Sequence, residues 1–253
     1  MIKIILHGCN GKMGQVISSL IAADDTIEIA AGVDLVDFGM NEYPVFSSIQ
    51  DCDVKADVII DFASVKAIDG LLAYSVQRKT PVVLCTTGIN EEQLRKIEEA
   101  SRQVAVLKSA NMSLGVNLLI KLVQTAASVL AQVDFDIEII EKHHNQKVDA
   151  PSGTALALAD AINQTLSNEY YYKYDRSAVR QKRERKEIGI MTVRGGTIVG
   201  EHEVIFAGND EVLELKHTAY SKGIFAKGAI QAAKYLAGKP AGYYNMSDVV
   251  GSF

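Results

Sequence analysis

The chain has 253 residues, 48% of them hydrophobic and 23% charged, which is the composition of a globular protein with an ample core. Its 26 Lys and Arg against 31 Asp and Glu give a net charge of −5, so nucleic acid is not an expected partner. The apolar start is too short for a signal peptide, and we expect no stretch that approaches the roughly twenty apolar residues of a membrane helix. Three cysteines without C-x-x-C spacing suit a reducing cytoplasm.

The first hundred residues alternate between short apolar strands and helical stretches. This alternation predicts an α/β domain with a parallel sheet covered by helices on both faces. The spacing of Asn90 and Gln93 predicts a capping box at one helix start. Strands are expected at 2–7, 27–33, 58–62, 82–85 and 104–107, and helices at 13–23, 65–78 and 91–102.

A glycine-rich turn follows the first strand, with glycines at positions 8, 11 and 14. Such a turn between strand and helix lets the backbone approach a pyrophosphate, although G-x-x-G-x-x-G is less common than G-x-G-x-x-G. Asp34 ends the second strand, about twenty residues beyond the turn, where a carboxylate can bind ribose hydroxyls. An ordinary turn residue is the alternative for Asp34. Together these features predict a Rossmann-like nucleotide-binding domain.

The pattern changes after residue 113. A long helix at 114–131 precedes strands that alternate polar and apolar residues, with a hairpin turn at Gly208-Asn209-Asp210. Alternation predicts an antiparallel or mixed sheet with one face free, and we expect Ile198, Val204, Phe206, Val212 and Leu215 to supply an exposed apolar face. The strands are expected at 135–141, 189–193, 197–207 and 212–219, followed by a final helix at 223–237.

The segment EKHHNQKVDAPSGT, residues 141–154, is the most informative part of the chain. His143, His144 and Lys147 supply proton-donating or cationic groups, and Gly153 and Thr154 lie at a helix start, where backbone N–H groups bind anions. This combination suits an acidic substrate whose reaction needs a proton. A histidine pair alone is more often structural. No metal site is expected, because neither histidine has a partner at i+4 and no cysteine is near.

These motifs resemble the 4-hydroxy-tetrahydrodipicolinate reductase (dihydrodipicolinate reductase) family of bacterial lysine and diaminopimelate synthesis. The resemblance covers nearly the whole chain except 167–186, and it rests on GCNGKMG, CTTG, SANMS, HHNQKVDAPSGTA and RGGTIVGEH. It implies a dinucleotide-binding domain at 1–113 and 222–253. It also implies an inserted α+β substrate-binding and tetramerisation domain at 114–221, with a mixed open sheet. The expected assembly is a homotetramer.

The resemblance also implies a role for each matching residue. His143 would be a proton donor or acceptor and Lys147 the proton donor, in the reduction of a cyclic dicarboxylate with loss of water. His144, Gly153 and Thr154 would hold the carboxylates. The cofactor would be bound by Gly8, Cys9, Asn10, Gly11, Lys12, Met13, Asp34, Cys85, Thr86, Thr87, Ser109, Ala110, Asn111 and Met112.

Residues 35–38 contain no Lys or Arg that could meet a 2′-phosphate, so we expect NADH to be favoured over NADPH. Two alternatives remain open: another two-domain dehydrogenase of amino-acid metabolism, acting on aspartate or its semialdehyde, and a nucleotide-sensing module without catalysis. The semialdehyde enzyme needs a cysteine in its second domain, whereas all three cysteines here precede residue 86. The tyrosines at 170–172 and 174 have no explanation in the pattern.

Overall fold

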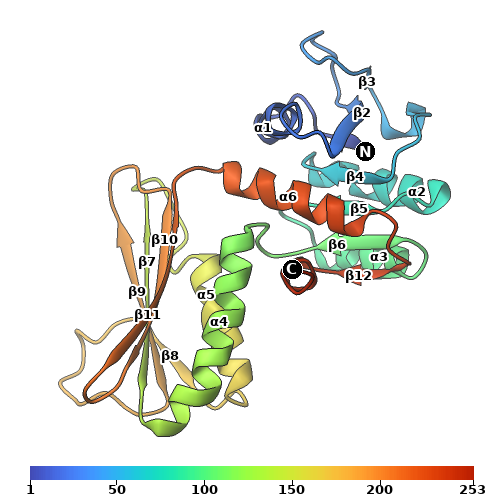
Figure 1. The fold of residues 1–253 in the computed structure, drawn as a ribbon. Helices are drawn as coiled ribbons and strands as arrows, with labels where there is room; N and C mark the ends of the chain where they lie inside the picture. The colour runs from blue at the N-terminus through green and yellow to red at the C-terminus, as the bar shows by residue number, and fades with distance from the viewer. The chain divides into compact units, whose positions relative to one another are not determined.

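A computed structural model describes all residues, 1–253, and the chain forms two compact units. The first combines Met1–Leu114 with Gly223–Phe253, and the second is Gly115–Lys222. The chain thus leaves the first unit once and returns to it at Gly223, and each unit has its own sheet and its own buried apolar residues (Figure 1).

The first unit is built on a seven-stranded sheet whose strands are all parallel, in the order β12-β6-β5-β4-β1-β2-β3. The central strands consist almost entirely of buried Ile, Val and Leu, because helices cover both faces. The strands are β1 (Ile2–His7), β2 (Ile27–Val33), β3 (Val45–Phe46), β4 (Val58–Asp61), β5 (Val82–Leu84), β6 (Ala105–Lys108) and β12 (Gly242–Tyr244).

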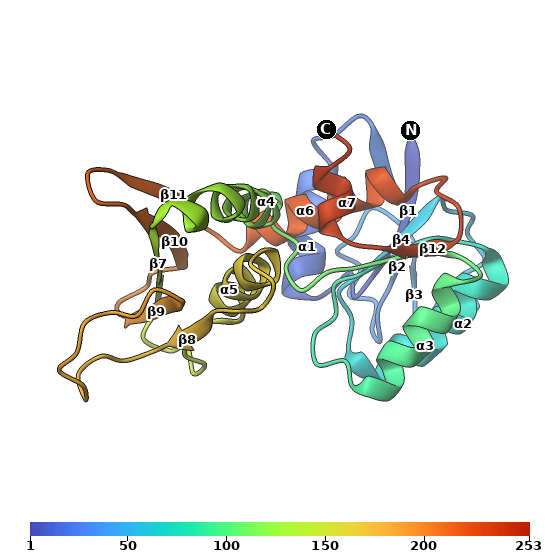
Figure 2. The same ribbon diagram turned by 90° about the horizontal axis from the view of Figure 1, so that it is seen from below.

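Two apolar cores lie on the two faces of this sheet. Helices α1 (Lys12–Ile21), α6 (Gly223–Leu236) and α7 (Met246–Val250) enclose one core, and α2 (Ile68–Arg78) and α3 (Glu91–Ser101) enclose the other. Figure 2 shows α2 and α3 side by side on their face of the sheet. Short 3-10 turns complete the unit at η1 (Ile49–Asp51) and η2 (Val65–Ala67).

The predicted capping box of α3 is confirmed. The Asn90 side chain accepts from the Gln93 backbone N–H at 2.8 Å, and Gln93 Oε1 accepts from the Asn90 backbone N–H at 3.2 Å. Both bonds satisfy N–H groups that the helix cannot pair itself, and they set the first residue of α3.

The second unit contains a five-stranded mixed sheet in the order β11-β10-β7-β9-β8. Strands β7, β8 and β9 run parallel to one another, and β10 and β11 complete the sheet in antiparallel pairs. The fold class expected from the sequence, a parallel-sheet α/β part with an inserted mixed-sheet part, is confirmed. The strands are β7 (Asp136–His143), β8 (Tyr171–Lys173), β9 (Glu187–Arg194), β10 (Gly200–Ala207) and β11 (Val212–Ala219).

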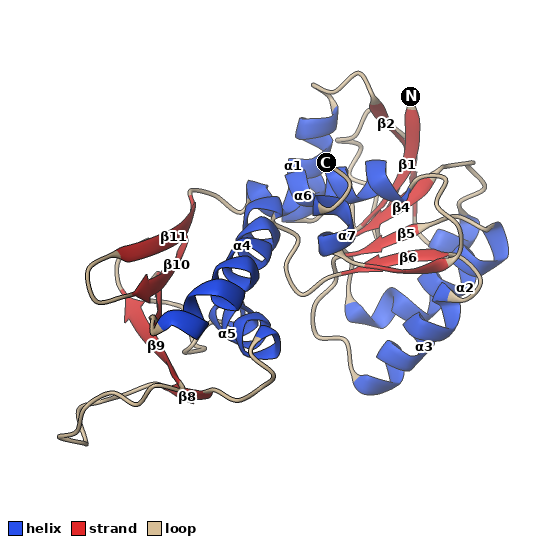
Figure 3. Ribbon diagram, turned by 60° about the horizontal axis from the view of Figure 1, so that its bottom comes forward, coloured by secondary structure: helices blue, strands red, loops and turns tan.

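Two helices, α4 (Leu114–Leu130) and α5 (Gly153–Thr165), cover one face of this sheet, and η3 (Ala131–Val133) extends α4. Figure 3 shows both helices on the same side, with no helix on the other side. Burial alternates along β7 and β10, so one set of side chains lies under the helices and the other on the open face. The hairpin turn at 208–210 is confirmed by a Gly208 N–H to Glu211 carbonyl bond of 2.9 Å.

The prediction of an apolar open face was wrong for three of its residues. Val204 and Phe206 are fully buried under the helices, and Leu215, opposite Val204 on β11, packs against the same core. The apolar set of an alternating strand turns toward the core, so these residues do not form the open face. Of the residues named, Val212 is exposed on that face.

The expectation that no apolar stretch reaches membrane length was also wrong. Leu114–Val133, 20 residues with a mean hydropathy of 1.6, meets the length and composition of a membrane-spanning helix. In the structure Leu119, Val123 and Ala127 on one side of this helix pack into the core of the second unit. The core helix of a soluble protein can meet the same two criteria, so length and composition do not show that this helix spans a membrane.

Candidate active site

The glycine turn between β1 and α1 requires two of its glycines. Gly8 has a φ of +83°, and a Cβ there would lie 2.8 Å from the backbone of Phe62 and Ala63. A Cβ on Gly14 would overlap the carbonyl oxygens of Gly8 and Cys9. Gly11, the N-cap of α1, has no side chain to bond the first N–H groups of the helix. The glycines therefore let the turn lie close to the neighbouring backbone, and the N-terminus of α1 keeps unpaired N–H groups that can bind an anion.

Asp34 lies immediately after β2 and faces the glycine turn. Its Oδ2 accepts from the Asn10 N–H and its Oδ1 from the Leu35 N–H, both at 2.8 Å. The carboxylate belongs to a cleft of about 660 Å³ within the first unit. The cleft is lined by His7, Gly8, Gly11, Val33, Asp34 and Leu35, together with residues 47–50, 62–64, 66, 67 and 70. The cleft thus joins the two nucleotide-binding features predicted from the sequence.

The carboxyl ends of β1, β4 and β5 meet in a buried polar cluster that the sequence analysis missed. His7 Nδ1 lies 2.8 Å from Asp61 Oδ1, and the Thr86 hydroxyl donates to Asp61 Oδ2 at 2.6 Å. Each of these residues ends an apolar strand or follows one. Because the carboxyl ends of parallel strands lie at the same edge of a sheet, this position in the sequence could have identified the cluster. Thr86, a predicted cofactor residue, is therefore fixed by Asp61.

The neighbouring predicted cofactor residues differ in exposure. Thr87 is exposed, whereas Cys85 packs against the core, and burial raises the pKa of its thiol well above the usual value. Cys9 is fully buried, and burial followed by the charge of Asp34 raises the pKa of its thiol to about 11. Both side chains thus pack against the same apolar core, Cys9 fully buried and Cys85 partly buried.

The segment 109–112 follows β6. Asn111 Oδ1 accepts from the Ser113 N–H at 2.8 Å, and the buried Met112 places its carbonyl against α6. A Cβ on Gly228 would overlap that carbonyl oxygen, so the glycine permits the close approach. Ala110 remains exposed at the tip of this segment.

The second unit contains a buried carboxylate, Glu141, on the helix-covered face of β7. Its Oε1 accepts from the Ser152 N–H at 3.0 Å, from Thr192 Oγ1 at 3.1 Å and from Arg194 Nη2 at 2.8 Å. Its Oε2 lies 2.9 Å from Arg194 Nη1 and 2.6 Å from His143 Nδ1. Burial raises the pKa of Glu141, but these hydrogen bonds outweigh burial and bring the pKa to about 2.

His143 ends β7, and its ring meets a second imidazole from β10. The rings of His143 and His202 lie edge to face with centroids 5.1 Å apart, and His202 Nε2 is 3.0 Å from Ser152 Oγ. Burial, and next the neighbouring charge of His143, lower the pKa of His202 to about 4, so His202 is neutral at neutral pH. Sequence reasoning missed Glu141, Ser152, Thr192, Arg194 and His202 as members of this cluster.

The other predicted catalytic residue, Lys147, lies on the segment that follows β7. Its Nζ is 2.8 Å from Asp149 Oδ1, and its backbone N–H bonds the His144 carbonyl at 3.2 Å. The Gly195 N–H bonds the His143 carbonyl at 2.9 Å, and the Asn145 N–H bonds the Gly196 carbonyl at 3.2 Å. The segment is thus held beside the chain that follows β9.

Helix α5 begins directly after this segment. Ser152 is its N-cap, and the Ser152 hydroxyl accepts from the Ala155 N–H at 3.2 Å. Gly153 and Thr154 are the first two helical residues, and open space surrounds the position of a Cβ on Gly153. The structure therefore places His143, Lys147 and the start of α5 in one unit, and the sequence predicts that these groups form a carboxylate-binding site.

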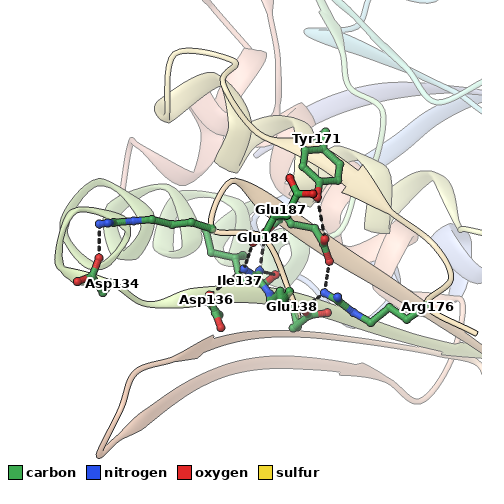
Figure 4. Close-up of polar contacts among 10 residues, drawn as sticks. Asp134, Asp136, Ile137, Glu138, Tyr171, Arg176, Glu184 and Glu187 are labelled. Carbon is green, nitrogen blue, oxygen red and sulfur yellow. Dashed lines mark hydrogen bonds and ion pairs between the residues drawn. The ribbon is translucent and has the colours of Figure 1, made fainter. Parts of the chain in front are cut away.

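The segment 173–186 is rich in Lys and Arg, and several of these side chains form ion pairs. Arg183 Nε lies 3.0 Å from Glu138 Oε1, and Arg176 pairs with both Glu138 and the buried Glu187 (Figure 4). The Tyr171 hydroxyl donates to Glu187 Oε2 at 2.9 Å, which gives this tyrosine of β8 a polar partner on the open face of the sheet. The segment is thus fastened to the sheet by ion pairs.

Comparison with known proteins identifies the family. The model for the N-terminus of dihydrodipicolinate reductase matches residues 2–112, and the model for its C-terminus matches residues 115–250. The 4-hydroxy-tetrahydrodipicolinate reductase of Caldanaerobacter subterraneus subsp. tengcongensis is 52% identical over 250 residues, covering 99% of this chain and 98% of the relative. The reductase of the same name from Clostridium novyi is 51% identical over 252 residues, covering 100% and 99%.

A solved structure has the same fold over its full length. The dipicolinate-bound dihydrodipicolinate reductase from Paenisporosarcina sp. TG-14 superimposes with a TM-score of 0.83 at 25% identity, covering 98% of this chain and 99% of that one. The two family models together, and each of the two relatives alone, span nearly all of the chain. The chain therefore belongs to the dihydrodipicolinate reductase family, whose members are nicotinamide-nucleotide-dependent oxidoreductases.

Proposed function

We propose that this protein reduces 4-hydroxy-2,3,4,5-tetrahydrodipicolinate to tetrahydrodipicolinate with a reduced nicotinamide nucleotide, in lysine and diaminopimelate synthesis in the cytoplasm. The observation that carries the proposal is the arrangement of His143, Lys147 and the N-terminus of α5 in a member of this family. The ring loses its hydroxyl as water, accepts hydride at that carbon, and takes a proton at the neighbouring carbon.

The nucleotide site is proposed at the cleft of the first unit. The start of α1 and the glycine turn fit a pyrophosphate, because Gly8 and Gly14 leave no side chain in the way. Asp34 lines the cleft beside the turn and can accept from ribose hydroxyls. When bound, the reduced nucleotide supplies the hydride. Its pyrophosphate and ribose would be held by Gly8, Cys9, Asn10, Gly11, Lys12, Met13 and Asp34.

The nicotinamide end is proposed at the carboxyl ends of β5 and β6, where parallel sheets bind their ligands. The hydroxyl of Thr86 is held by Asp61 at 2.6 Å, so its position is fixed before a ligand binds. Backbone groups of the two segments would complete the contact. The residues concerned are Cys85, Thr86 and Thr87 after β5, and Ser109, Ala110, Asn111 and Met112 after β6.

The carboxylates of the substrate are proposed to bind at the start of α5. A helix N-terminus favours an anion, and Gly153 leaves room for a carboxylate to approach the backbone. His144 and the Thr154 hydroxyl would add hydrogen bonds. The related reductase whose structure contains dipicolinate, a planar dicarboxylate, supports this class of ligand.

Proton delivery is proposed for Lys147, with His143 as proton donor and acceptor. The Lys147 ammonium lies 2.8 Å from Asp149, whose side chain is half exposed, so a substrate carboxylate can compete for the same ammonium. The ion pair holds the pKa of Asp149 below its usual value, and Asp149 is therefore a carboxylate when the substrate arrives. His143 lies near the same segment, with one ring nitrogen bound by Glu141.

The assembly is proposed to be a homotetramer formed through the open face of the mixed sheet. Charged side chains of this face, such as Glu138, are paired with arginines of the 173–186 segment. Between them lie apolar side chains without a covering helix, on strands β7, β9, β10 and β11: Ile140, Met191, Val193, Ile205 and Val212. A face of this mixed character suits association of sheets.

A direct assay tests the proposed reaction. NADH absorbance is followed with freshly generated 4-hydroxy-tetrahydrodipicolinate, with aspartate semialdehyde, and without substrate. We expect oxidation of NADH with the first compound alone. Oxidation with aspartate semialdehyde, or none with either compound at micromolar enzyme, would contradict the proposal. The semialdehyde is the informative control, because all three cysteines lie in the first unit.

A further inference from the structure

Glu141 and His143 occupy positions i and i+2 of β7, so their side chains lie on the same face of the strand. The two groups are in contact through Glu141 Oε2 and His143 Nδ1, 2.6 Å apart. Glu141 is completely buried and His143 is 9% exposed. The contact therefore joins a buried carboxylate to the imidazole that the proposed function uses for proton exchange.

The charge of Glu141 determines which nitrogen of His143 carries the proton. The hydrogen bonds around Glu141 bring its pKa to about 2 against the opposing effect of burial, so the group is ionised at neutral pH and can only accept. His143 Nδ1 must therefore donate, and in the neutral ring Nε2 is the unprotonated nitrogen. A Cβ on Gly200 would lie 3.1 Å from Nε2, so the glycine keeps a side chain from covering that nitrogen.

Glu141 is itself held from three directions. The Ser152 N–H at the start of α5, the Thr192 hydroxyl on β9 and the Arg194 guanidinium at the end of β9 all bond its carboxylate. We propose that Glu141 is a positioning residue for the reaction: it fixes the His143 ring with the proton on Nδ1 and leaves Nε2 for proton exchange with the substrate. This inference rests on the proposed role of His143.

The charged groups near His143 come from several elements. Glu141 lies on the same strand, Arg194 on β9 and His202 on β10, and Lys147 and Asp149 follow β7. Arg194 is paired with Glu141, and burial keeps His202 neutral, so Glu141 is the carboxylate in direct contact with the ring. Loss of the Glu141 charge removes a group that stabilises the imidazolium form of His143. The part of the pH–rate profile that depends on protonation of His143, the His143 limb, should therefore move to lower pH.

Glu141→Gln and Thr192→Val form a matched pair for testing this role. Both remove interactions at the same carboxylate, but Thr192 does not contact His143. We expect Glu141→Gln to lower kcat by about 10- to 100-fold, by analogy with the loss of a partner that orients a metal-binding imidazole, with KM changed less than about threefold. Its pH–rate limb should move to lower pH. Thr192→Val should lower Tm without moving that limb.

A measurement on the unaltered protein covers the case in which Glu141→Gln does not fold. Nitrogen-15 NMR of the imidazoles over a series of pH values, with His143→Gln for assignment, should show that the neutral form of His143 carries its proton on Nδ1. A neutral His143 ring with its proton on Nε2 would overturn the inference, as would a Glu141→Gln enzyme whose pH profile matches that of Thr192→Val. Absence of reductase activity in the wild type would contradict the proposed function instead, and the NMR result would still decide the tautomer.

Discussion

Ser152 Oγ and His202 Nε2 lie 3.0 Å apart in the interior of the second unit, and together they join the N-cap of α5 to β10. Both residues are at most 5% exposed. The contact makes the packing of α5 on the sheet depend on a buried imidazole that remains neutral. This dependence has a consequence for stability in acid.

Stability should fall as pH falls below 6.5, because burial lowers the pKa of His202 from 6.5 to about 4. Between these values the unfolded chain binds a proton at His202 and the folded chain does not, so acid favours unfolding, and above 6.5 neither state does. The pKa of Glu141 is lowered from 4.5 to about 2, so this group adds its own loss of stability only below pH 4.5. Thermal melts at pH 7.5, 6 and 5 should show a smaller loss of Tm in His202→Gln than in the wild type. Parallel curves for the two proteins would contradict this assignment.

Cofactor preference can be predicted from the residues around Asp34. The carboxylate lines the cleft and would repel a 2′-phosphate, and residues 35–38 add no cation, although Lys12 at the start of α1 could offset part of the repulsion. We expect NADH to be used at least as well as NADPH. The measurement is kcat/KM for both nucleotides in the same buffer. Asp34→Ser with Leu35→Arg should move the ratio toward NADPH, and a wild-type value tenfold higher with NADPH would contradict the prediction.

The assembly can be tested with one substitution on each face of the second unit. Ile205 lies on the open face of the sheet between Glu138 and Glu214, and Val129 is 61% exposed on α4 on the other side. Light scattering should give the mass of a tetramer for the wild type at micromolar concentration. Ile205→Lys should produce smaller species, because an ammonium would be buried in the interface, and Val129→Lys should not. A wild-type monomer, or equal effects of the two variants, would exclude this interface.

Elements with strong local signals were predictable from the sequence. Asn90 set the start of α3, and the glycine turn lies at the end of β1 as expected. Short edge elements such as β3, β8 and β12 were missed, because two or three residues carry no periodicity. The tyrosine run proved to contain β8, in which the Tyr172 hydroxyl donates to Asp160 of α5 at 2.6 Å. That partner could not be found without the fold.

The candidate site was predictable only in its local part. His143, Lys147 and the start of α5 lie within one segment, so spacing alone grouped them. Glu141 appeared to be an ordinary charged residue of an alternating strand, yet it lies on the buried face and is paired with Arg194, which is 53 residues away. A buried charge requires such partners, and sequence spacing does not reveal partners brought together by strand pairing.

Proton delivery gives the sharpest division between the predicted roles of Lys147 and His144. If Lys147 delivers the proton in the transition state, Lys147→Ala should lower kcat by roughly the 10²- to 10⁴-fold typical of a general acid. His144 is proposed to hold a carboxylate equally in the ground and transition states, so His144→Ala should chiefly raise KM. His143→Ala should resemble Lys147→Ala. Steady-state constants at saturating NADH, with Tm for each variant, distinguish the two patterns.

The alternative is that all three residues simply hold the segment that follows β7, whose backbone bonds to Gly195 and Gly196 are independent of these side chains. In that case each substitution would lower Tm and change kcat and KM alike. Asp149→Asn serves as the control, since it removes the ion-pair partner of Lys147 and leaves the ammonium in place. It should retain kcat far better than Lys147→Ala. A Lys147→Ala enzyme with kcat within about threefold of wild type, well below the range for a general acid, would remove Lys147 from proton delivery.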